Sequence, residues 1–363
     1  DISVAFLQSS AYGPQAGEDA RYVSYVPYKG ADPRVFRLLG PLYGQRSAPR
    51  RWYATVAAWL TKPESEGGAG LVQGCNEPCV FRHPTKDLVV VLYVDDILTS
   101  GDEASTAVFH ERLGEEYECT EPSYLAPDSP LDFLGFSITT EVVDGDTFIY
   151  MDQTEALSLL LSRFDAGELH PKDAPMPTRT LLNSDPTPLS VNAGALYKHL
   201  VGSLNYFVRT TRFDMAYAVS RLSSFMSSPT VGAWKALQHL LGYLKATVDF
   251  RIGGLIPASG DEFSYFVDSD HASDKANSTR SQTGYILFLN SFPVEWSSKR
   301  QPHTSVAPAE AEVYAMSEAV YAGRLLGWVA EEIGLEVRWP FELQSGSSQA
   351  VSYQHSTCPN SKM

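Results

Sequence analysis

The stretch Leu88-Val89-Val90-Val91-Leu92-Tyr93-Val94-Asp95-Asp96-Ile97-Leu98 joins a run of seven apolar residues to two adjacent carboxylates. The β-rich run predicts a strand, and the return to apolar residues after Asp95-Asp96 predicts a hairpin with both carboxylates at its tip. Two adjacent carboxylates at this place are unfavourable through desolvation and mutual repulsion, unless a divalent cation offsets both effects. In a regular strand they would point to opposite faces, whereas a hairpin tip can present both. An ordinary exposed Asp-Asp turn is the alternative, and these residues alone leave the two interpretations open.

The composition of the whole chain excludes some classes of function. The chain has 363 residues, with 28 basic and 43 acidic side chains and a formal charge of −15, which argues against a protein that simply coats nucleic acid. The basic residues are unevenly placed, because Arg34 to Lys62 and Lys198 to Arg251 are two basic islands. These islands could contact a phosphate backbone, or they could be solvated surfaces. The length suits two or three domains, and the apolar runs are too short to span a membrane.

Proline and glycine divide the chain into three segments. His170 to Ser190 and Gly253 to Asp261 are predicted connectors. The predicted helices are Ala48 to Leu60, Ser105 to Tyr117, a helical bundle within Leu196 to Thr247, and Ala309 to Ile333. Besides the hairpin, the predicted strands are Leu131 to Ile138, Phe263 to Val267, Gly284 to Leu289, Pro293 to Ser297 and Phe341 to Gln344.

Several separated motifs occur in a fixed order along the chain. They are Asp1-Ile2-Ser3-Val4-Ala5-Phe6-Leu7, Leu42-Tyr43-Gly44-Gln45-Arg46-Ser47-Ala48-Pro49-Arg50, Tyr93-Val94-Asp95-Asp96, Phe133-Leu134-Gly135, and the stretch from Tyr197 to Arg221. Together they resemble the reverse transcriptase of copia-type LTR retrotransposons. The resemblance covers nearly the whole chain.

This resemblance implies a metal-dependent polymerase site. Asp1, Asp95 and Asp96 match the three aspartates that hold two Mg²⁺ ions, with Mn²⁺ as an alternative, for nucleotidyl transfer. Phe6 matches an aromatic gate that favours deoxynucleotides, although a plain core phenylalanine fits it nearly as well. The residues that match the nucleotide- and template-binding loop are Gly44, Gln45, Arg46, Pro49 and Arg50. Gln45 and Ser47 depart from the usual leucine and glutamine of this motif.

A second carboxylate site follows in the last segment. The stretch Tyr265 to Ala272 resembles the first strand of the ribonuclease H domain that follows the polymerase in these elements, with Asp268 as its first metal ligand. Asp270 lies on the same strand face and could substitute for it. At ~100° per residue, Glu312 shares the apolar side of the long helix and is the metal-ligand candidate, whereas Glu310 lies on the solvated side.

The second site lacks part of the family pattern. Gly346 stands where an aspartate is expected, and the chain stops before a further expected carboxylate. Because two carboxylates would bind a metal pair poorly, we expect weak or absent ribonuclease H cleavage. The chain also begins at the first aspartate, so the upstream part of the fingers is expected to be missing.

The resulting expectation is an α+β protein with three parts. Residues 1–169 would form a reverse-transcriptase palm with partial fingers, 170–258 a helical thumb or connection, and 259–363 a truncated ribonuclease H-like domain of mixed α/β type. The resemblance implies as partners an RNA template, a DNA primer, an RNA–DNA hybrid, deoxynucleoside triphosphates and other parts of the Pol polyprotein. It also implies a cytoplasmic location within virus-like particles. A catalytically inactive nucleic-acid-binding remnant is the alternative.

The cysteines add little to this expectation. Of the four, only Cys75 and Cys79 lie close together, and no second ligand pair follows them. Their spacing matches no strong zinc pattern, so structural roles are expected.

Overall fold

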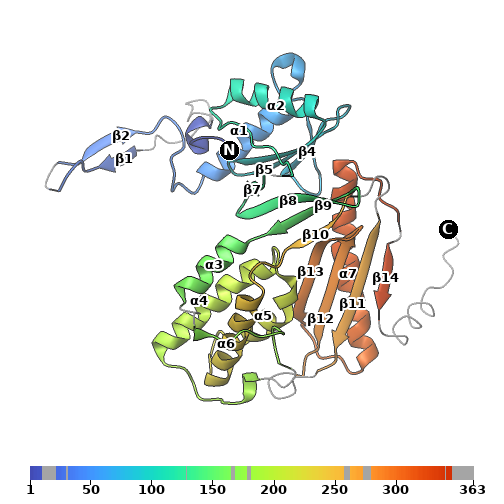
Figure 1. Cartoon of the computed structure of the whole chain (residues 1–363). Coiled ribbons are helices and arrows are strands. Elements are labelled where there is room, and N and C mark those ends of the chain that lie inside the picture. Colours follow the sequence, from blue (N-terminus) through green and yellow to red (C-terminus); the bar gives the residue numbers. More distant parts are fainter. Residues whose placement is uncertain are drawn as a thin grey trace. The chain divides into compact units, whose positions relative to one another are not determined.

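The computed structural model describes residues 1–9, 22–29, 32–127, 129–164, 168–177, 181–256, 262–272, 279–339 and 341–345. The chain divides into two compact units, Asp1–Ser123 with Trp328–Leu335 and Tyr124–Gly327 with Glu336–Met363. Both contain helices and mainly antiparallel sheets, which agrees with the predicted α+β class (Figure 1). The finer division into three domains stays a prediction.

The first unit is built on a four-stranded antiparallel sheet of order β3-β4-β5-β6. Its elements are β3 (Val72–Gln73), β4 (Val80–Arg82), β5 (Leu88–Tyr93), β6 (Asp96–Gly101), α1 (Ala48–Thr61) and α2 (Glu103–Glu116). Alternate residues of β5 are buried, namely Leu88, Val90 and Leu92, as the period of two in a strand requires. They form one core with Trp52 of α1 and Phe109 of α2, so both helices pack against the central strand.

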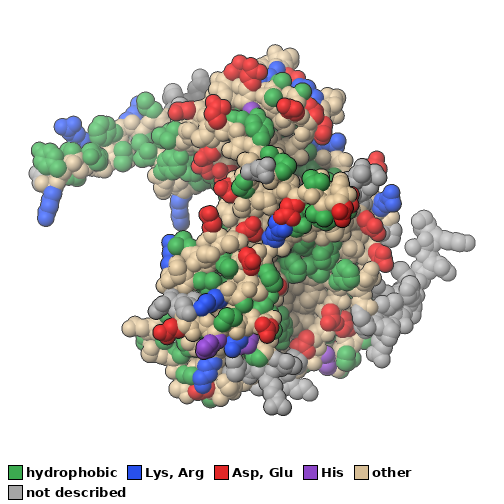
Figure 2. Space-filling view, viewed as in Figure 1, with side chains coloured by type: hydrophobic (Ala, Val, Ile, Leu, Met, Phe, Trp, Pro, Cys, Tyr) green, Lys and Arg blue, Asp and Glu red, His purple; other side chains and the backbone are tan. Residues whose placement is uncertain are grey.

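A separate antiparallel hairpin in the first unit consists of β1 (Tyr22–Tyr25) and β2 (Arg34–Arg37). Seven of its eight residues are exposed, with Tyr22 at 62% and Tyr25 at 57%. Figure 2 shows hydrophobic and basic side chains together along this hairpin. The hairpin therefore presents apolar and cationic groups to solvent.

The second unit contains a sheet of order β10-β9-β8-β7, which corrects two predictions. Its strands are β7 (Leu131–Phe133), β8 (Phe136–Val143), β9 (Asp146–Asp152) and β10 (Ile252–Leu255). The single strand predicted over Leu131 to Ile138 is wrong, because Leu134 and Gly135 adopt positive φ values of 52° and 78° and form a hairpin turn. The connector predicted from Gly253 also begins too early. Gly253 belongs to β10, where an added Cβ would lie 2.1 Å from the Tyr150 ring, so only glycine permits this close strand pairing.

Four helices of the second unit share one core and confirm the predicted bundle. They are α3 (Thr154–Arg163), α4 (Val191–Val208), α5 (Ala216–Ser223) and α6 (Val231–Ala246). Arg212 is only 1% exposed, and its charge is compensated by Asp214 at 2.8 Å. Arg212 also donates to Thr247, while the Tyr243 hydroxyl donates to Asp214. This network joins the turn before α5 to α6.

The remaining sheet of the second unit has the order β13-β12-β11-β14, in which β11 and β14 are parallel. Its strands are β11 (Phe263–Asp270), β12 (Gln282–Leu289), β13 (Phe292–Arg300) and β14 (Glu342–Ser345), and α7 (Pro308–Ile333) follows β13. Tyr265 of β11 packs with Met316 and Ala319 of α7. A Cβ on Gly323 would lie 1.6 Å from the Tyr265 hydroxyl, so glycine allows the helix to lie this close. No helix of the described residues is long and apolar enough to cross a bilayer.

Candidate functional site

The hairpin that carries the two adjacent aspartates has a tight turn of two residues. Tyr93 pairs with Asp96, so Val94 and Asp95 form the turn and Asp96 is the first residue of β6. This differs slightly from the prediction, which placed both aspartates at the tip. Val94 has φ 56°, in a region that a β-branched residue rarely adopts and that costs about 1–3 kcal/mol. Strain of this kind is concentrated at functional sites.

Asp1 lies beside this turn. The amide of the next residue, Ile2, donates to the carbonyl of Asp95 at 2.9 Å. On the other side, the amide of Thr120 donates to the carbonyl of Asp1 at 3.0 Å, and Ile2 forms a β-bridge with Cys119. The backbone therefore brings Asp1 next to two aspartates that follow it by more than ninety positions.

The three carboxylates remain available to a ligand. Asp1 is exposed, Asp95 and Asp96 are partly exposed, and no described side chain donates to them. Among the described residues, however, no three His, Cys, Asp or Glu side chains converge on one point that could hold a metal ion. The donor chemistry suits Mg²⁺, but shared ligation requires rotation of these exposed side chains.

Phe6 lies between the core and the surface. It is partly buried against the core of the first unit, and its ring centroid is 4.7 Å from that of Tyr43. Tyr43 is half exposed and belongs to the loop that precedes α1. The two rings are tilted by 42°, and this contact is compatible with both sequence interpretations of Phe6. Sequence reasoning did not single out Tyr43.

The loop before α1 and the first turn of that helix present most of the remaining predicted residues to solvent. Gly44 has φ 88°, which favours glycine. The side-chain oxygen of Gln45 accepts from the Leu42 amide at 3.2 Å, so this residue holds the loop itself. Of the predicted binding residues, Gly44 and Arg46 are exposed in this loop, and Pro49 and Arg50 are exposed in the first turn of α1. No described acidic residue forms an ion pair with either arginine, so both charges remain available to an anion.

The second pair of carboxylates lies where β11 and the first turns of α7 meet. Glu312 is 9% exposed, and its Oε2 accepts no hydrogen bond from any described residue. Burial raises the pKa of the Glu312 carboxyl, and the negative charge of Asp268 raises that pKa further. Met316, Ala319 and Gly323, which lie on the same side of the helix as Glu312, are buried, which confirms the prediction that Glu312 is on the apolar side.

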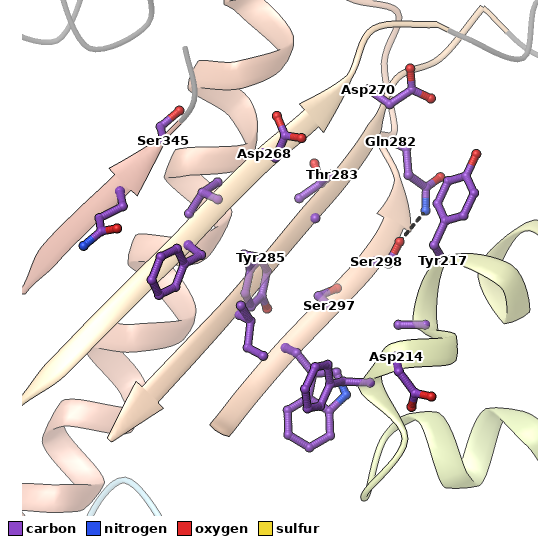
Figure 3. Close-up of a pocket in the computed structure, with 18 residues that line it drawn as sticks. Asp214, Tyr217, Asp268, Asp270, Gln282, Thr283, Tyr285, Ser297, Ser298 and Ser345 are labelled. Atoms are coloured by element: carbon purple, nitrogen blue, oxygen red, sulfur yellow. Dashed lines mark hydrogen bonds between the residues drawn. The ribbon is translucent and has the colours of Figure 1, made fainter. Parts of the chain in front are cut away.

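Two other predictions for this region can be compared with the structure. Glu310 is exposed and accepts from the Val306 amide at 2.6 Å, so it caps the start of α7. Asp268 and Asp270 project from the same face of β11, as the period of two predicts (Figure 3). Gly346 and the residues after it lie outside the described part of the chain.

Asp268 and Asp270 face a groove of about 820 Å³ within the second unit. Strands β11, β12 and β13 line one wall, while Tyr217 of α5 and Asp214 of the preceding turn line the other (Figure 3). Gln282 of β12 joins the two walls, because its Nε2 donates to Ser220 at 2.9 Å and to Ser298 at 3.0 Å. The groove leaves the Asp268 face of the sheet accessible to a ligand.

The hairpin site also depends on a residue that sequence reasoning missed. The indole Nε1 of Trp52 donates to the carbonyl of Val94, the strained residue of the turn. A tryptophan in a predicted helix carries no sequence signal that it contacts a distant turn.

Cys75 and Cys79 are free thiols, and the described residues contain no metal-binding group around them.

Comparison with known proteins finds relatives that align with most of the chain. It is 29% identical to the Retrovirus-related Pol polyprotein from transposon RE2 of Arabidopsis thaliana over 94% of this chain, and 27% identical to that from transposon TNT 1-94 of Nicotiana tabacum over 83%. The chain is thus related, over most of its length, to the Pol polyproteins of copia-type retrotransposons. This Pol chain spans about a fifth of the length of those two relatives, since it covers 22% of each.

A yeast relative has nearly the same extent as this Pol chain. A transposon Ty5-1 protein of Saccharomyces cerevisiae is 27% identical over 88% of this chain and 99% of its own length. No protein-family model matches the chain. The predicted relation to copia-type elements is thus confirmed by relatives that align with most of the chain.

Proposed function

We propose that this Pol chain carries the RNA-directed DNA polymerase of its element, with Asp1, Asp95 and Asp96 as ligands for Mg²⁺ or Mn²⁺. The observation that carries the proposal is the hydrogen bond from the Ile2 amide to the Asp95 carbonyl, which brings Asp1 next to the aspartate hairpin. The names of the Pol relatives support a role in a transposon.

The chemistry of the donor set fits hard divalent cations, which prefer carboxylate oxygens. When bound, such ions supply the Lewis acidity that nucleotidyl transfer to a primer 3′-hydroxyl needs. The chain itself fixes the backbone of the three aspartates through β5, β6 and the contact with Ile2. Because the side chains are free of protein partners, their rotation toward a shared cation breaks no hydrogen bond with a described residue.

The template RNA, the DNA primer and the deoxynucleoside triphosphates are the partners in this proposal. The β1–β2 hairpin supports nucleic-acid binding, because Tyr22 pairs with Arg37 on one face and Tyr25 pairs with Arg34 on the other. Aromatic rings stack on bases, and guanidinium groups contact phosphates. The exposed Arg46 extends this cationic character to the loop before α1, and the exposed Arg50 extends it to the first turn of that helix.

In the same proposal, residues 1–169 form the palm with partial fingers, 170–258 the thumb or connection, and 259–363 a degenerate ribonuclease H-like domain. Asp268 and Glu312 would be the remaining metal ligands of that domain. The orphaned Oε2 of the buried Glu312 supports this role, since a cation would satisfy it.

Primer extension on poly(rA)/oligo(dT) in the full-length Pol context tests the polymerase. We expect Mg²⁺-dependent incorporation that falls by more than about 100-fold in the double variant Asp95→Asn/Asp96→Asn, because metal affinity drops 10–100-fold even when outer-shell partners are lost. The matched control is Asp144→Asn/Asp146→Asn, which changes two exposed aspartates at the turn between β8 and β9.

Among the residues that the structure describes, the ligand side chains as placed do not converge in a group of three, and this arrangement favours one other function, a catalytically inactive nucleic-acid-binding remnant. If the unmodified full-length protein binds primer–template but incorporates no nucleotide, the polymerase proposal fails and the remnant is correct.

A further inference from the structure

The two residues of the hairpin turn are held from two different elements. The carbonyl of Asp95 accepts from the Ile2 amide, and the carbonyl of Val94 accepts from the indole Nε1 of Trp52 in α1. Both contacts go to backbone atoms, so they fix the conformation of the turn and leave the aspartate side chains free.

The Val94 backbone needs such a contact. Its φ of 56° is unfavourable for a β-branched side chain, and Val94 is 43% exposed, so packing around its side chain contributes little. A strained conformation persists only where the surroundings impose it. The hydrogen bond from Trp52 to the carbonyl of this same residue is a direct way to impose it.

Trp52 is itself rigidly placed. It is 1% exposed and makes an edge-to-face contact with Tyr117, with ring centroids 5.4 Å apart and planes at 80°. Its indole N–H therefore has a fixed direction before any ligand binds. Two of the template-binding candidates, Pro49 and Arg50, lie in the first turn of the same helix, so α1 links the turn to these candidates.

We propose that Trp52 is a positioning residue, whose indole N–H holds the Val94 carbonyl and thereby keeps the turn in the conformation that presents Asp95 and Asp96. Its effect on the turn follows from the contacts alone, whereas its effect on catalysis rests on the proposed polymerase function.

The test compares two tryptophans of the same helix. Trp52→Phe removes the donor and keeps an aromatic ring. The matched control is Trp59→Phe, because Trp59 is 6% exposed in the same core, contacts the same Tyr117, and has a buried Nε1 with no hydrogen-bond partner among the described residues. Thermal unfolding of both variants checks that each is folded.

Amide hydrogen exchange of the β5–β6 turn is the direct readout. We expect Trp52→Phe to speed exchange at the amides of Tyr93 and Asp96, the pair that closes the turn, by about fivefold or more, as the loss of one hydrogen bond predicts, while Trp59→Phe leaves these amides unchanged. In the Trp52→Phe background, Val94→Gly should restore slow exchange, because glycine adopts positive φ without strain. Equal exchange in the two tryptophan variants, or no rescue by Val94→Gly, would overturn the proposal.

Primer extension in the full-length Pol context separates this inference from the proposed function. We expect Trp52→Phe to lower kcat by about tenfold with little change in KM for the primer, and Val94→Gly to recover most of the loss. Altered exchange without activity in any protein, the unmodified one included, would support the positioning role and contradict the polymerase. Altered exchange with unchanged kcat in an active polymerase would contradict the catalytic part of the inference.

Discussion

Asp95 and Asp96 lie at a turn where their carboxylates meet solvent and no described side chain donates to them, whereas Glu312 is buried against a helix–sheet core beside Asp268. The first site is assembled by backbone hydrogen bonds, and the second by the packing of α7 on β11. The difference teaches that a carboxylate site can be ready for a cation in two ways. At the hairpin, the carboxylates of Asp95 and Asp96 stay hydrated until a cation binds. At the second site, the Glu312 carboxyl is already removed from water, and a bound cation would stabilise its charged form.

The largest expected effect concerns the number of ligands at the second site. We predict that Gly346→Asp, in a protein extended by the matching downstream stretch of the RE2 relative, raises cleavage of an RNA–DNA hybrid by about tenfold or more, because the metal pair gains carboxylate ligands. Hybrid cleavage is measured with a labelled RNA strand.

The control for this gain is the same protein with Asp268→Asn, which should remove the cleavage and leave primer extension unchanged. If restoring both the aspartate and the downstream stretch gives no gain in cleavage, Asp268 and Glu312 are not the nuclease ligands. The description of the second site as a metal site would then be wrong.

A smaller effect tests the burial of Glu312. Burial raises the pKa of the Glu312 carboxyl in the folded chain above its usual value of about 4.3. Ionisation of Glu312 therefore favours the unfolded chain. The free energy of unfolding is expected to fall as the pH rises from about 4.3 through the raised pKa. Glu312→Gln should therefore raise Tm at pH 7 more than at pH 4. A gain of a few degrees is expected, since ~1 kcal/mol shifts Tm by about 2–4 °C for a unit of this size.

Glu310→Gln is the matched control, because Glu310 is exposed on the same helix and should show no such gain. Saturating Mg²⁺ should remove the advantage of Glu312→Gln by stabilising the unmodified protein. A Glu312→Gln variant that is less stable than the unmodified protein at both pH values would contradict the desolvated-acid description.

Sequence reasoning succeeded where a local pattern determines the structure. The apolar run followed by Asp95-Asp96 predicted the hairpin, and helical periodicity placed Glu312 on the buried side of α7. It failed where one residue changes the local geometry. The strand predicted through Leu134 and Gly135 breaks because both residues adopt positive φ, which the apolar pattern does not encode.

The long-range contacts of the hairpin site could be predicted only in part. Motif order indicated that Asp1 belongs with Asp95 and Asp96, and the structure brings the Asp1 backbone to the turn. Nothing in the sequence around Trp52 pointed to Val94, because a single side-chain hydrogen bond across 42 positions leaves no periodic signal.

The central claim is that Asp1, Asp95 and Asp96 share a metal site, and calorimetric titration with Mn²⁺ tests it most directly. The titration uses the chain with Glu312→Gln, which silences the second site, and compares Asp1→Asn, Asp96→Asn and the turn control Asp144→Asn. We predict that Asp1→Asn and Asp96→Asn each weaken Mn²⁺ binding by about tenfold or more, while Asp144→Asn leaves it unchanged. Binding that is weakened by Asp96→Asn but unaffected by Asp1→Asn would contradict the shared site.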